Sequence, residues 1–148
     1  MLRLFNSLSR EVEEFKPINP PAVSVYTCGP TVYQFAHIGN LRSFSAADIL
    51  VRALALENYN VNFVMNITDV GHLTNDDAGG ADTGEDKIEK TALKEGKTAS
   101  EVSKFYTDAF LRDYNALNMT LPAHLPKATD HISEQIQLIE KLQKKGYT

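Results

Sequence analysis

Two short apolar runs separated by a helix-like stretch constrain the fold of this chain most strongly. Residues 22–27 (AVSVYT) and 61–67 (VNFVMNI) are rich in β-branched and aromatic side chains, which favour strands. Residues 41–57 between them carry apolar side chains around most of the circumference of a helix, which predicts a largely buried helix. A strand–helix–strand unit of this length favours two parallel, neighbouring strands joined by a crossover. The expected fold class is therefore α/β.

The segments on either side complete a coarse division of the chain. Residues 1–21 predict a hairpin (2–15) with Leu2 and Leu4 on one arm and Val12 and Phe15 on the other, followed by a proline-rich connector. The strand–helix–strand unit extends over residues 22–69. A polar, glycine-rich and acidic stretch at 70–86 predicts a loop, and residues 87–148 predict a helical segment.

Helical periodicity continues through most of that last segment. Thr98 and Glu101 have the spacing of a capping box, which predicts the start of a helix. The apolar stripe of this helix predicts core packing rather than a cofactor site; it consists of Val102, Phe105, Tyr106, Ala109 and Phe110. A linker (LPAHLP) precedes a final helix at roughly 130–145, whose inward-facing side chains should be Ile132, Ile136, Ile139 and Leu142.

Composition excludes several classes of protein. The net charge of −4 provides no overall basic field for non-specific nucleic-acid binding. A single cysteine excludes an internal disulfide and fits a reducing compartment. No apolar stretch approaches the roughly 20 residues that a membrane span needs, and the N-terminus is no signal peptide. We therefore expect a cytoplasmic protein with no membrane partner.

Polar residues follow both predicted strands at the point where each strand ends. The first strand leads into Thr27-Cys28-Gly29, and the second into Asn66-Ile67-Thr68-Asp69. Parallel strands bring their carboxyl ends to one edge of a sheet, where open α/β proteins bind ligands. The helix is expected to begin near Asn40, so its N-terminal amides and the His37 side chain should face the same edge and suit a phosphate. Gly39 would allow close approach of that phosphate. The pattern predicts a nucleotide site with a thiol beside it.

Simpler interpretations of these residues remain open. Cys28 taken alone is compatible with a small buried apolar side chain, and His37 with an exposed turn residue. We interpret His72, His124 and His131 as structural or surface residues. The acidic stretch at 71–86 lacks the fixed aspartate spacing of a calcium loop, so a solvated loop is the better interpretation.

Taken together, CGPTVYQFAHIGN (28–40) and NITDV (66–70) resemble the N-terminal catalytic region of the cysteinyl-tRNA synthetases, which are class I aminoacyl-tRNA synthetases. His-Ile-Gly-Asn at 37–40 is similar to their His-Ile-Gly-His signature. LRLFNSLSREVEEFKP, YNALNM and KATDHI are similar as well, so the likeness runs over essentially the whole chain. The resemblance implies the first half of a Rossmann-like catalytic domain that adenylates cysteine with ATP and magnesium and transfers it to tRNA(Cys).

The resemblance also implies roles for individual residues. Cys28 would be one of four ligands of a zinc ion that binds the substrate thiolate, which would reject serine. His37 and Asn40 would be the catalytic residues. The remaining positions would contact substrates: the ATP-binding set is Thr31, His37, Ile38, Gly39 and Asn40, and the cysteine-binding set is Gly29, Thr31, Thr68 and Asp69.

Two departures from the family pattern set further expectations. Asn40 stands where the signature has its second histidine, so a phosphate contact there would be weaker. The family's other zinc ligands, its Lys-Met-Ser-Lys-Ser loop and its tRNA-binding regions would lie beyond residue 148. We therefore expect an N-terminal part of the enzyme, weakly active or inactive by itself. The alternatives are a ligase that attaches cysteine to an amino-sugar at the same adenylation site, and a non-catalytic ligand-binding module.

Overall fold

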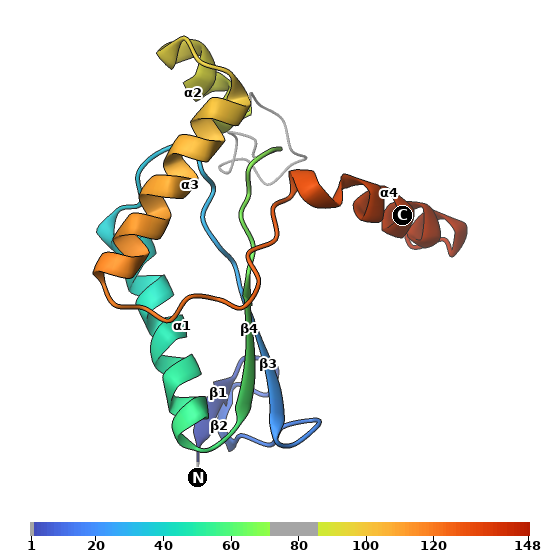
Figure 1. Cartoon of the computed structure of the whole chain (residues 1–148). Coiled ribbons are helices and arrows are strands. Elements are labelled where there is room, and N and C mark those ends of the chain that lie inside the picture. The colour runs from blue at the N-terminus through green and yellow to red at the C-terminus, as the bar shows by residue number, and fades with distance from the viewer. Residues whose placement is uncertain (1, 72–85) are drawn as a thin grey trace.

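The computed structural model describes residues 2–71 and 86–148. Its elements are arranged around a pair of strands, β3 (Ala22–Thr27) and β4 (Asn60–Met65), with helices α1 (Ile38–Leu56) and α3 (Ala99–Ala116) along one side (Figure 1). A separate antiparallel hairpin of β1 (Arg3–Asn6) and β2 (Glu11–Glu14) confirms the predicted hairpin. The predicted loop lies largely within residues 72–85, and His72 lies there too, outside the described residues.

The central strands pair as the sequence predicts. β3 and β4 are parallel, with Ala22 opposite Asn60 and Thr27 opposite Met65. Helix α1 connects them, which confirms the strand–helix–strand unit and the α/β class. Phe63 and Met65 of β4 are buried, so this strand forms one side of the core.

Helix α1 is buried on one face only, which corrects the prediction of a helix buried around most of its surface. Phe44, Val51 and Leu54 are buried, whereas Ile49 and Leu56 are 67% and 84% exposed. The buried face also contains a carboxylate, Asp48, that the apolar pattern gave no reason to place there. Four alanines, at positions 46, 47, 53 and 55, make the helix apolar without requiring burial, and this explains the error.

Asp48 is buried because it fastens α1 to the chain that follows α3. Its carboxylate accepts a hydrogen bond from the backbone N–H of Thr120 at 2.7 Å and pairs with Arg52 at 2.8 Å. Burial raises the pKa of Asp48, but the hydrogen bonds from Thr120 and Arg52 outweigh it, so the pKa lies below its usual value. This carboxylate therefore stays ionised and holds α1 to the segment that follows α3.

Helices α2 (Lys87–Glu95) and α3 form the other wall of the core. The predicted stripe of α3 is buried except for Phe105, which is 43% exposed. Phe44 of α1 meets Phe110 of α3 edge-on, with ring centroids 5.1 Å apart. The core therefore lies between β4, α1 and α3.

The segment at 123–128, which the sequence suggests is only a linker, pairs with the end of β4 and the residues just after it, from Phe63 to Ile67. The N–H groups of Met65 and Ile67 donate to the carbonyl oxygens of His124 and Pro126 at 3.1 and 2.8 Å. Bridges from Val64 to His124 and from Ile67 to Lys127 are parallel. Prolines cannot donate hydrogen bonds, but their carbonyls accept them, so a proline-rich segment can serve as an edge strand.

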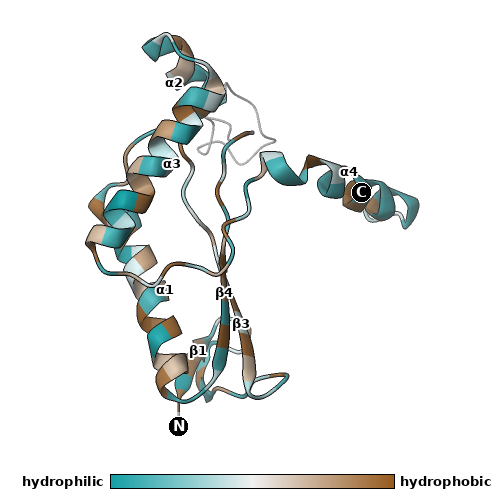
Figure 2. Cartoon of the chain, viewed as in Figure 1, coloured by the Kyte–Doolittle hydropathy of each residue, from teal (hydrophilic) through white to brown (hydrophobic). Residues whose placement is uncertain are grey.

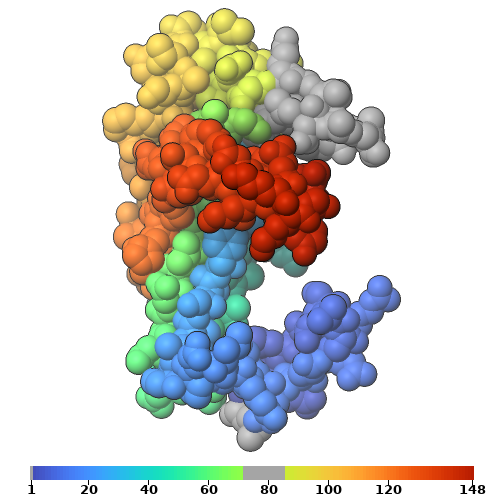
Figure 3. All heavy atoms as spheres, turned by 90° about the vertical axis from the view of Figure 1, so that its right-hand side faces the viewer, coloured from blue at the N-terminus to red at the C-terminus, as the bar shows by residue number. Residues whose placement is uncertain are grey.

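The C-terminal helix α4 (Ile132–Lys144), preceded by a short helical turn, η1 (Thr129–His131), is not packed against the core. It projects away from the strands in Figure 1. Apolar and polar residues alternate along it (Figure 2). Ile132, Ile136 and Ile139 are 44%, 51% and 51% exposed, which corrects the prediction that they face inward. Figure 3 shows an open hollow between α4 and the β1–β2 hairpin.

Within the described ranges, 2–71 and 86–148, no helix combines the length and the apolar character that crossing a membrane requires.

Candidate functional site

The carboxyl ends of β3 and β4 are tied together by one side chain, that of Asn66. Its Oδ1 accepts hydrogen bonds from the Gly29 backbone N–H at 2.9 Å and from the Tyr26 hydroxyl at 3.0 Å, while its Nδ2 donates to Thr68 at 3.1 Å. A Cβ on Gly29 would lie 1.7 Å from the Asn66 carbonyl oxygen. Only glycine permits this approach, so the turn after β3 depends on it.

Backbone pairing extends beyond these strand ends. The Val32 N–H donates to the Thr68 carbonyl at 3.1 Å, and the Thr68 N–H donates to the Pro30 carbonyl at 3.0 Å. These hydrogen bonds hold the chain between Pro30 and Asn40, which connects the edge of the sheet to the start of α1 and forms a wall.

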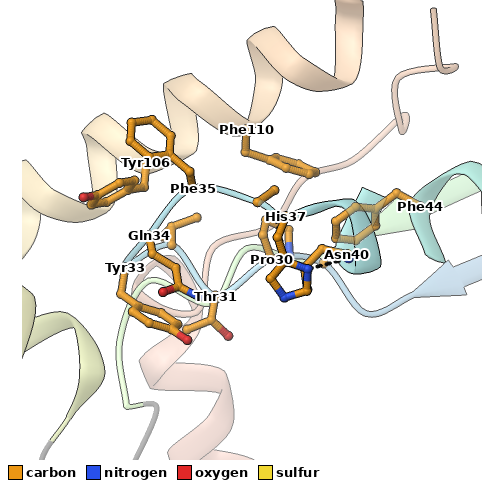
Figure 4. Close-up of a pocket in the computed structure, with 13 residues that line it drawn as sticks. Pro30, Thr31, Tyr33, Gln34, Phe35, His37, Asn40, Phe44, Tyr106 and Phe110 are labelled. Carbon is orange, nitrogen blue, oxygen red and sulfur yellow. Dashed lines mark hydrogen bonds between the residues drawn. The ribbon is translucent and has the colours of Figure 1, made fainter. Parts of the chain in front are cut away.

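This wall encloses one side of a cavity of about 250 Å³ (Figure 4). The sides come from the segment 29–37, the first turns of α1 and the buried face of α3. Small-molecule sites usually measure roughly 300–1,000 Å³, so this cavity suits part of a nucleotide or an amino acid. The residues that line it are Gly29, Pro30, Thr31, Val32, Tyr33, Gln34, Phe35, Ala36, His37, Asn40, Phe44, Tyr106 and Phe110.

The imidazole of His37 occupies the N-terminus of α1. Its Nδ1 accepts hydrogen bonds from the backbone N–H groups of Gly39 at 3.1 Å and Asn40 at 3.4 Å. The Asn40 Oδ1 in turn accepts from the His37 N–H at 3.1 Å, and Figure 4 shows the pair beside Pro30. Two amides that the sequence suggests for a phosphate are therefore held by His37 itself in this structure.

The tyrosine on the α3 side of the cavity is held in its neutral form. The hydroxyl of Tyr106 donates to Glu95 at 2.7 Å, and this hydrogen bond, together with burial, raises the pKa of Tyr106. The cavity-lining residues include no Asp, Glu, Lys or Arg, so hydrogen bonding rather than fixed charge dominates its interior.

The predicted site residues separate into two groups. Gly29, Thr31, His37 and Asn40 come together around the cavity. The other five predicted positions do not line it. They are Cys28, Ile38, Gly39, Thr68 and Asp69.

The structure shows where four of these five residues lie instead. The Ile38 side chain is 86% exposed, and Gly39 lies under the His37 ring. Thr68 supports the cavity wall through its backbone. Asp69 accepts hydrogen bonds from the Thr129 N–H at 3.0 Å and the Thr129 hydroxyl at 2.6 Å, which fixes the start of the segment leading to α4.

Cys28 is a free, exposed thiol, so the interpretation as a buried apolar side chain is wrong. A zinc site takes about three or four protein ligands. In the described part of the chain, no group of three or more His, Cys, Asp and Glu side chains is placed to hold a metal ion. The described residues therefore do not form a complete zinc site, and Cys28 could supply at most one of its ligands.

Sequence reasoning missed several residues that build this site. Asn66 is among the polar residues that the sequence places at the end of the second strand, but its hydrogen bonds to Gly29 and Tyr26 could not be predicted from the pattern. Phe44, Tyr106 and Phe110 are core residues that also form the cavity wall, and the apolar stripes reveal only the first of these roles. Tyr33, Gln34 and Phe35 had no periodic pattern that could have identified them.

Parallel strands whose carboxyl ends meet the N-terminus of a helix, with a histidine there that lines a cavity, are typical of α/β proteins, which bind their ligands at this edge of the sheet. Residues 14–148 match the family described as tRNA synthetases class I (C) catalytic domain. The chain therefore belongs to this family.

Its relatives are longer proteins. It is 50% identical over 147 residues to the cysteine–tRNA ligase of Treponema denticola, covering 99% of this chain and 29% of the relative. The corresponding enzyme of Zymomonas mobilis is 50% identical over 144 residues, or 97% of this chain and 27% of that protein. That of Borrelia turicatae is 44% identical over all 148 residues and 30% of that protein. The chain thus spans about three tenths of the length of these relatives.

Proposed function

We propose that this chain forms part of the site at which a cysteine–tRNA ligase activates cysteine with ATP and then charges tRNA(Cys). The cavity would receive the reacting end of the nucleotide, with the cysteine carboxylate attacking the α-phosphate to give cysteinyl-adenylate and pyrophosphate. Protein synthesis takes place in the cytoplasm, which is where we expect the protein to act.

The His37 ring is the observation that supports this proposal most. With Nδ1 accepting from two amides, the proton of the neutral ring belongs on Nε2, on the opposite side of the ring. An Nε2–H beside the cavity can donate a hydrogen bond to a phosphate oxygen on which charge develops. The other groups proposed for ATP binding are Thr31, Ile38, Gly39 and Asn40.

The uncharged lining limits what these residues do alone. A triphosphate carries several negative charges, and the cavity-lining residues supply donors but no lysine or arginine. The proposed role of this region is therefore to position the phosphates, while magnesium and cations from other parts of the protein balance their charge.

For the cysteine substrate we propose contacts from Gly29, Thr31, Thr68 and Asp69, with the exposed Cys28 thiol as one zinc ligand. Asp69 would reach the substrate only if it released Thr129, so it is the weakest member of this set. The remaining ligands of a zinc ion would come from residues outside the described ones.

A chimera provides the direct test. This chain would replace the matching segment of the Treponema denticola enzyme, to which it is 50% identical. We expect exchange of labelled pyrophosphate into ATP that depends on cysteine and not on serine. Charging of a tRNA(Cys) transcript is measured in parallel.

A folded chimera without cysteine-dependent exchange would contradict the proposal, provided that its circular dichroism matches the parent enzyme. Exchange driven by cysteine without tRNA charging, together with transfer to an amino-sugar, would point instead to the alternative ligase.

A further inference from the structure

The first turn of α1 contains a reciprocal pair of hydrogen bonds between His37 and Asn40. The ring nitrogen of His37 accepts from the Asn40 N–H, and the Asn40 side-chain oxygen accepts from the His37 N–H. This is the pattern of a capping box. Histidine is not among the residues preferred at an N-cap, where Ser, Thr, Asp and Asn predominate. The choice of histidine therefore needs a reason beyond helix stability.

Gly39 makes this cap sterically possible. A Cβ at this position would lie 2.9 Å from Cε1 and 3.0 Å from Nδ1 of the His37 ring. Contacts this short would push the ring away from the helix. Its backbone N–H also donates to Nδ1, so the same residue provides both the space and one of the two donors.

We propose that Asn40, besides the ATP contact proposed above, is a positioning residue that acts through His37. Its side-chain oxygen holds the His37 backbone at the N-cap, which keeps Nδ1 on the helix amides and leaves Nε2–H for the cavity. Asparagine suits this task because its Oδ1 accepts a hydrogen bond and its side chain is uncharged. Gly39 is the second positioning residue, through the space it leaves.

The catalytic consequence rests on the proposed function, but the geometry can be tested without any ligand. Nuclear magnetic resonance on the full chain would record two quantities: the ¹⁵N shifts of the His37 ring at alkaline pH and the hydrogen-exchange rates of the amides of residues 39 and 40. The variants are Asn40→Ala, Asn40→Asp and His37→Ala, with the Val51 amide in the middle of α1 as the internal control.

We expect an acceptor-type Nδ1 and a protonated Nε2 in the native chain. In His37→Ala the two amides should exchange about tenfold faster, and in Asn40→Ala about threefold faster with altered ring shifts. Asn40→Asp loses the amide donor but keeps the acceptor oxygen for the His37 N–H. Because the proposal depends on that acceptor alone, this variant should retain native protection and ring shifts. Val51 should be unaffected throughout.

Native exchange and ring shifts in Asn40→Ala would overturn the proposal, as would a protonated Nδ1 in the unsubstituted chain. The second outcome needs no variant, so it applies even if a substitution disturbs folding.

Titration with inorganic tripolyphosphate separates this inference from the proposed function. If native geometry is present but tripolyphosphate leaves the His37 signals unchanged, the positioning holds and phosphate binding at His37 fails. If it shifts the Nε2 signal of the native chain, Asn40→Ala should weaken that binding about threefold to tenfold.

Discussion

Helices α1 and α3 both begin with a capping box, but they are built from different residues. At α3, Thr98 accepts from the Glu101 N–H at 3.2 Å, and the Glu101 carboxylate accepts from the Thr98 N–H at 2.8 Å. At α1, His37 and Asn40 take the equivalent positions. Thr98 and Glu101 are the residue types that helix starts favour, whereas histidine is a poor choice for an N-cap.

The difference indicates that the two helix starts serve different purposes. The α3 box uses both partners to satisfy the helix and its own backbone. The α1 box satisfies the same backbone groups with one side of an imidazole ring, and His37 is also one of the residues that line the cavity. A helix start that stabilises the fold and one that also presents a donor should respond differently to substitution.

The largest effect should follow from His37→Asn. Asparagine is a preferred N-cap, so the free energy of unfolding should change little. The imidazole Nε2–H is lost, however, and the Nδ2 donor of the shorter asparagine lies closer to the backbone and should not reach the same phosphate oxygen. Loss of one such donor commonly costs 10²-fold or more in rate. Cysteine-dependent pyrophosphate exchange by the chimera should therefore fall about 100-fold. His124→Asn, at an exposed histidine outside the cavity, is the matched control and should leave exchange unchanged.

Asp48→Ala tests how the middle of α1 is held in place, and we assign Asp48 a structural role only. The change removes the acceptor for the Thr120 N–H and the partner of Arg52. Leaving such groups unpaired costs about 1–3 kcal/mol, so urea denaturation should show a loss of that size. Asp108→Ala removes an exposed carboxylate that also pairs with a helix cation and should cost much less. Equal losses in the two variants would show that burial of Asp48 adds nothing.

Thr98→Ala breaks the box at α3. The expected loss is about 1 kcal/mol in the free energy of unfolding, because one amide of the first turn loses its acceptor. Exchange activity of the chimera should be unaffected at temperatures where the protein is folded. A loss of activity comparable to that of His37→Asn would contradict the division of roles between the two helix starts.

The smallest effect concerns pH. Hydrogen bonds from the backbone N–H and the hydroxyl of Thr98 lower the pKa of Glu101 below its usual value. A lowered pKa in the folded state stabilises the protein above the unfolded pKa of about 4.3, and this contribution is lost as the pH falls through the folded pKa. Stability measured between about pH 6 and pH 3 should thus fall less in Glu101→Gln than in the native chain. Identical pH profiles would show that the hydrogen-bonded carboxylate contributes nothing.

The site illustrates how far sequence reasoning reached. The pattern of apolar runs predicted that the ends of two strands and the start of a helix meet, and Gly29, Thr31, His37 and Asn40 do line one cavity. It failed to show that Asn66 ties the strand ends together or that Phe110 closes the far wall. Such contacts join residues some 40 to 80 positions apart, and no local periodicity encodes them.

Local chemistry in the sequence determined the parallel strands, the helix between them and the capping box at Thr98, because strand propensity, apolar periodicity and caps act over a few residues. Only the tertiary structure decided which apolar faces are buried. The isoleucines of α4 have the same helical spacing as the buried stripe of α3, yet they stay exposed because no element of the described chain packs against them. Burial depends on a partner surface, and a sequence pattern can offer a face but cannot supply its partner.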